Sequence, residues 1–70
     1  MTAVTLSDRI TVQEAGGRLV AIIGGQAFDP GDQVGGGGHA GPLVQAEAIG
    51  ARLQGRISTE ELEWCSAFWK

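Results

Sequence analysis

The first part of the chain alternates apolar and polar residues with a period of two, which is typical of a strand with one buried face. The apolar positions of this segment are Val4, Leu6, Ile10 and Val12. Asp8 interrupts the apolar face and indicates a bend, a bulge or the start of a strand. A second run, Arg18 to Ile23, is rich in β-branched residues and predicts another strand.

The pair Gly16-Gly17 separates these two runs and predicts a two-residue β-hairpin loop, because glycine accepts the positive φ angles of a type I′ turn. In the resulting register Val12 faces Ala21. The apolar residues gathered on one face are then Ile10, Val12, Leu19, Ala21 and Ile23. Collecting the apolar set on one side supports this register.

An irregular, glycine-rich segment is expected from Gly24 to Gly41, with a strong turn signal at Asp29-Pro30-Gly31-Asp32. Gly36, Gly38 and Gly41 match the glycine spacing of a dinucleotide-binding fingerprint, but an uninterrupted run such as Gly35 to Gly38 produces this match by accident. A true fingerprint joins a strand to a helix within a larger βαβ unit, and no second parallel strand is expected here. We interpret the segment as a connector rather than a cofactor site.

Apolar residues in the second half recur at helical spacing. Pro42 suits the first turn of a helix, and Gly55 suits its end. The apolar side of this helix, typical of a stripe that faces a core, is expected to carry Leu43, Ala46, Ile49, Gly50 and Leu53.

The strongest local signal is a capping box formed by Ser58 and Glu61, flanked by a hydrophobic staple of Ile57 and Leu62. It predicts a last helix that starts near Thr59 and runs toward the end of the chain. The pattern as a whole predicts a small single α+β domain over residues 1–70, of order ββαα. Residues 1–28 form the β-hairpin half, 29–42 the glycine- and proline-rich loop, and 43–70 a helical hairpin.

Composition narrows the classes of function. The chain has a net charge of −3, and its five Lys and Arg residues are scattered, which argues against direct binding of nucleic acid. No run approaches the ~18 apolar residues of a membrane span, and the first residues lack the features of a secretory signal. A single cysteine, Cys65, fits a reducing compartment, so we expect a cytoplasmic protein.

Candidate chemistry is sparse. The chain has one histidine, His39, and one cysteine, Cys65, too few for a common four-ligand zinc site. Cys65 lies between apolar helical positions and is interpreted as a packing residue. Glu60 and Glu61 are explained by helix capping and the helix dipole. We therefore expect no catalytic, cofactor-binding or metal-binding residue, and no enzyme.

The aromatic residues gather at the end of the chain, at Trp64, Phe68 and Trp69. With Leu62 and Cys65 they span roughly 160° of a helical wheel, against about 100° for an ordinary core stripe. Either all of them are core, or one edge meets a partner. Because Leu62, Cys65 and Trp69 already provide an inward seam, Trp64 and Phe68 are the foremost predicted contacts. The full set of predicted partner-binding residues is Trp64, Phe68, Trp69 and His39.

A chain of 70 residues without a disulfide is marginally stable alone, which favours association with a larger protein complex or with itself. We expect a non-catalytic protein–protein interaction module. Small, acidic, motif-poor chains of this kind resemble phage-encoded inhibitors of host complexes, such as anti-CRISPR proteins, in general character. The alternative is a structural or assembly subunit, such as a minor virion component, that is stabilised by oligomerisation.

Overall fold

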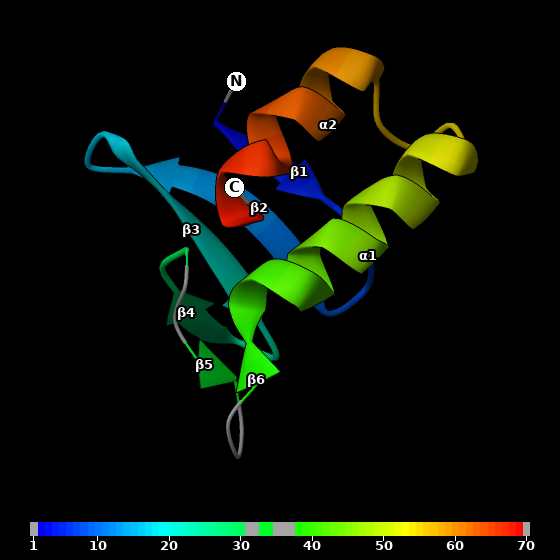
Figure 1. Cartoon of the computed structure of the whole chain (residues 1–70). Coiled ribbons are helices and arrows are strands. Elements are labelled where there is room, and N and C mark those ends of the chain that lie inside the picture. Colours follow the sequence, from blue (N-terminus) through cyan, green and yellow to red (C-terminus); the bar gives the residue numbers. More distant parts are fainter. Residues whose placement is uncertain (1, 31–32, 35–37, 70) are drawn as a thin grey trace.

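The alternating segments of the N-terminal half form an antiparallel sheet in which consecutive strands are neighbours (Figure 1). The computed structural model describes residues 2–30, 33–34 and 38–69. The four strands of the sheet are β1 (Ala3–Thr5), β2 (Ile10–Ala15), β3 (Arg18–Ile23) and β4 (Gln26–Phe28). A separate short pair consists of β5 (Gln33–Val34) and β6 (Gly38–His39).

The predicted hairpin register is confirmed. Val12 pairs with Ala21, and Ile10 pairs with Ile23. Gly16 and Gly17 have φ angles of 61° and 82°, so the turn uses the left-handed region that glycine tolerates.

The segment from Val4 to Val12, predicted as one strand, is instead two strands joined by a tight reversal. The Ser7 hydroxyl accepts hydrogen bonds from the backbone N–H groups of Arg9 and Ile10, at 3.3 and 3.2 Å. Such a local side-chain bond competes with strand pairing and stabilises the turn. Val4 therefore pairs with Val12, and the bend indicated by Asp8 lies within the reversal.

The expectation of an irregular segment from Gly24 onward is wrong for its first residues. Gly24 and Gly25 have φ angles of 59° and 85° and repeat the turn of the first hairpin. They bring β4 back along β3, with Ala21 paired to Phe28. Of the glycine run, Gly35 to Gly37 lie outside the described residues.

Two helices follow, α1 (Ala40–Leu53) and α2 (Thr59–Cys65), and a 3-10 turn, η1 (Ser66–Phe68), continues the second. The capping box is confirmed: the Ser58 hydroxyl accepts from the Glu61 N–H at 3.1 Å, and the Glu61 carboxylate accepts from the Ser58 N–H at 2.8 Å. Gly55, at φ 75°, ends α1 as expected.

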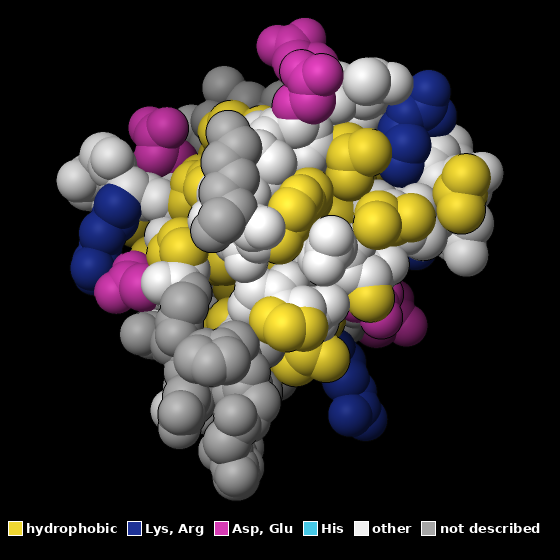
Figure 2. Space-filling view, in the orientation of Figure 1, with side chains coloured by type: hydrophobic (Ala, Val, Ile, Leu, Met, Phe, Trp, Pro, Cys, Tyr) yellow, Lys and Arg dark blue, Asp and Glu magenta, His cyan; other side chains and the backbone are white. Residues whose placement is uncertain are grey.

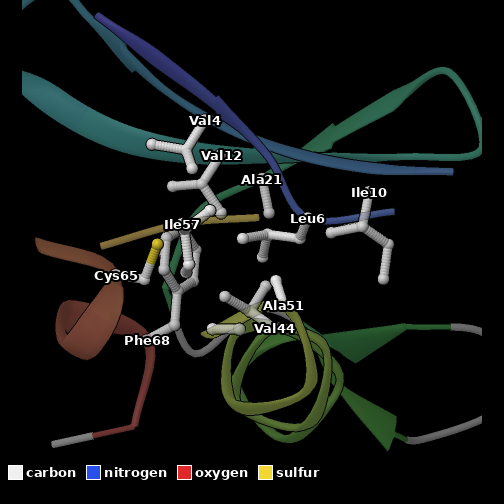
Figure 3. Packing of buried hydrophobic residues seen from close by; sticks show 11 residues of the cluster. Val4, Leu6, Ile10, Val12, Ala21, Val44, Ala51, Ile57, Cys65 and Phe68 are labelled. Carbon is white, nitrogen blue, oxygen red and sulfur yellow. The ribbon is translucent and has the colours of Figure 1, made fainter. Parts of the chain in front are cut away.

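The core lies between the sheet and the helices (Figure 3). Val4 and Val12 lie on the sheet side of this cluster with Leu6, which follows β1, and Val44 of α1 lies on the helix side, while Phe68 closes the cluster from the C-terminal segment. The small α+β architecture predicted from the sequence is therefore confirmed, with a four-stranded sheet in place of a two-stranded hairpin.

Candidate interaction surface

The outer side of α1 exposes large apolar side chains. Leu53 is 83% exposed, and Ile49 and Leu43 are 44% and 41% exposed. Within the described part of the chain, these three are the exposed large hydrophobic residues, and all belong to one helix. Figure 2 shows hydrophobic side chains gathered over α1 on this face of the molecule.

The α1 stripe, defined here as Leu43, Ala46, Ile49, Gly50 and Leu53, is the side that its apolar pattern predicts to face the core. That prediction is wrong. The side of α1 that is buried consists of Ala40, Gly41, Val44, Ala48 and Ala51. Small side chains let a helix approach its neighbours closely, whereas the larger leucine and isoleucine side chains would hold it away.

A second signal for the buried side was present in the sequence. Val44, Ala48 and Ala51 also recur at helical spacing, so α1 has two apolar sides, and size rather than hydrophobicity decides between them. When a helix is apolar on two sides and only one of them packs against the core, the other side stays exposed. The α1 stripe is this second side.

A hollow of about 380 Å³ adjoins the stripe at its Leu43 end. Ile10, which is buried, and Ile23, which is half-buried, provide its apolar lining, and Leu43 belongs to both surfaces. The polar residues that line it are Ser7, Asp8, Arg9 and Glu47. The hollow thus lies where the reversal between β1 and β2 approaches the first half of α1.

The charged residues around this surface differ in whether they already have a hydrogen-bond or ion-pair partner. Arg52 donates from Nε to the Thr59 hydroxyl at 3.0 Å, and Arg56 donates to the Leu6 carbonyl. By contrast, among the residues that the structure describes, Asp8, Arg9 and Glu47 form no ion pair. The hollow therefore has two carboxylates and one guanidinium that form no ion pair with another residue of the described part.

The predicted aromatic contacts occupy different environments. Phe68 is 4% exposed and belongs to the core, so its side chain is not available to a partner while the core is closed. Trp64 and Trp69 are half-buried and pack against the same core. Their role as partner contacts remains a prediction, as does that of His39, whose backbone lies in β6 and whose side chain is outside the described part.

Cys65 has no exposed surface, and burial together with the nearby charge of Glu61 raises its pKa to about 11. A thiol with this pKa is protonated at neutral pH and is a poor nucleophile. Over residues 2–30, 33–34 and 38–69, no group of three His, Cys, Asp or Glu side chains has the arrangement of a metal site. Neither described helix has the length and apolar character needed to cross a bilayer.

No protein-family model, curated protein or solved structure matches this chain.

Proposed function

We propose that the protein is a non-catalytic protein–protein interaction module and that the α1 stripe is its docking surface. The observation that carries this proposal is the concentration of Leu43, Ile49 and Leu53 on one side of one helix. Single exposed apolar residues are common on protein surfaces, but a contiguous set marks a site of association. Leaving three such side chains in water has a free-energy cost that a partner would remove.

The chemistry of the described side chains supports a binding role over catalysis. Cys65, the chain's one thiol, is buried in its protonated form. The hollow offers Asp8, Arg9 and Glu47, which are suited to recognising charge. We therefore favour a module that acts by occupying the surface of a larger complex, as an inhibitor such as an anti-CRISPR protein does.

A structural or assembly subunit is the second candidate, and the spacing of the α1 stripe favours it. In an antiparallel pair of two copies, Leu43 would meet the other copy's Leu53, and Ala46 would meet Gly50. This order of large, small, small and large residues reads the same in both directions, as a two-fold interface requires.

The mass of the native complex distinguishes the two candidates. The tagged full chain would be purified from its source cells beside the double variant Ile49→Ser and Leu53→Ser, with the exposed Ala67→Ser as a control outside the stripe. One copy bound to a larger assembly, lost in the double variant and kept in the control, supports the interaction module. A symmetric assembly of this chain alone supports the subunit, and turnover of a substrate by the isolated chain would overturn both.

A further inference from the structure

We propose that the occupant of the α1 stripe is an amphipathic helix of a partner protein that places a Lys or Arg side chain in the hollow between Asp8 and Glu47. This inference rests on the proposed function and adds the chemistry of the partner.

The shape of the stripe suits a helix. Its residues Leu43, Ala46, Gly50 and Leu53 follow the three-four-three spacing with which one helix packs along another. An added Cβ at Gly50 would have no atom of another described segment within 4 Å, so packing within the described part of the chain does not require a glycine there. In the middle of the stripe, Ala46 and Gly50 leave room for close approach of a second backbone, while the large residues at both ends would hold its apolar side chains.

The charges of the hollow determine which charge the partner helix should carry on the flank that faces the hollow. Among the described residues that line the hollow, Asp8 and Glu47 contribute two negative charges and Arg9 one positive charge, a net charge of −1. One cation from the partner would neutralise it. The aliphatic part of a lysine or arginine side chain would contact Ile10 and Ile23 while its charged end reaches the carboxylates. Complementary charge of this kind provides specificity and a faster association rate.

A second copy of this chain is a poorer occupant. Consider two copies of α1 packed antiparallel about a two-fold axis, with Leu43 of each opposite Leu53 of the other. A given flank of one helix then lies against the same flank of the other. Glu47 lies one residue from the midpoint of that pair, so the two Glu47 carboxylates would face each other. Like charges opposed across an interface disfavour association. The pair would also leave the hollow unfilled, because Arg52, the basic residue of α1, lies toward Thr59 of α2.

The test uses the purified full chain and two synthetic helical peptides of about 18 residues, long enough to span α1. Both carry leucines along one side. One has lysines on a flank, and the other has glutamates at the same positions. Titration calorimetry should give a dissociation constant at least about tenfold lower for the lysine peptide. Glu47→Gln should reduce this preference to about threefold or less. Glu14→Gln, the same change on exposed surface at the far end of β2, should leave it unchanged.

Four results would overturn the inference, and they are distinguishable from failure of the proposed function. If both peptides bind with equal affinity and Leu53→Ser abolishes that binding, the α1 stripe is a docking surface but the partner helix needs no basic flank. Binding unaffected by Leu53→Ser, or no binding of either peptide, would show that this stripe does not accept such a helix, and the native-mass experiment would then judge the proposed function independently. Self-association of the chain, reversed by Leu53→Ser in sedimentation, would make a second copy the occupant.

Discussion

Gly41 shows how one residue without a side chain sets the distance between two segments. It is buried in the first turn of α1, where a Cβ on this residue would overlap the backbone carbonyl oxygen of Phe68. Gly41→Ala should therefore force α1 away from the C-terminal segment and lower the free energy of unfolding by about 1–3 kcal/mol. Urea denaturation measures this change.

Gly50 provides the matched control for that substitution, because it lies in the same helix and a Cβ there would meet nothing. Gly50→Ala should stabilise the protein by up to about 1 kcal/mol, since alanine is the better helix former. A similar gain in both variants would mean that helix propensity, and not the contact with Phe68, determines the effect at Gly41.

Burial of Cys65 predicts how stability depends on alkaline pH. The folded-state pKa is raised from its ordinary value of 9.0 to about 11, so the folded chain holds the thiol proton more tightly than the unfolded chain does. The associated stability is fully present below pH 9 and is lost as the pH rises through about 11. Chemical denaturation under a reductant should show this decline, and Cys65→Ala should show a shallower one. Equal slopes for the two proteins would contradict a buried, protonated thiol.

Among the elements, α2 depends most clearly on its cap. It has seven residues, too few for stability by helix propensity alone. Ser58→Ala removes the acceptor for the Glu61 N–H and should cost about 1 kcal/mol, measured as a lower denaturation midpoint. Ser58→Thr retains a hydroxyl and should recover most of the loss. A midpoint that is the same in all three proteins would mean that the cap makes no net contribution.

The elements also show why sequence patterns succeed in one place and fail in another. The hairpin register follows from Gly16-Gly17 and a two-residue period, because shifting it by one position would expose the whole apolar face. The same glycine signal at Gly24-Gly25 introduces only a three-residue strand, too short to show a period. For α1 the pattern holds two apolar sides, and only tertiary packing decides which one is buried.

Sequence patterns could not predict the candidate site either, because it too is formed by tertiary packing. The hollow joins residues of the β1–β2 reversal, such as Asp8, to Leu43 and Glu47 of α1, which are far apart along the chain. No spacing rule links these positions. The aromatic residues Trp64, Phe68 and Trp69 are concentrated in sequence, which predicts a contact surface, yet Phe68 is buried in the core.

On the scale of the whole molecule, the sheet and the helices depend on one shared core. Its buried residues come from β1, β2, β3, both helices and the segments beside them. Arg56, between the helices, donates to the carbonyl of Leu6, which directly follows β1. Separate unfolding of either half would expose the apolar surface of the other, so the molecule should unfold as a single unit.

Replacing Gly16 and Gly17 with valine tests this cooperativity. Both glycines have positive φ angles that a β-branched residue disfavours, so the double variant should weaken the pairing of β2 with β3. Trp64 and Trp69 lie at the opposite end of the chain, beyond the sheet, and report on the helical half by fluorescence. In a cooperative molecule their denaturation midpoint should fall by the same amount as the midpoint of the circular dichroism signal. If the sheet signal is lost first and the tryptophan transition stays at its wild-type midpoint, the helices hold together without the hairpin, and the single-unit account is wrong.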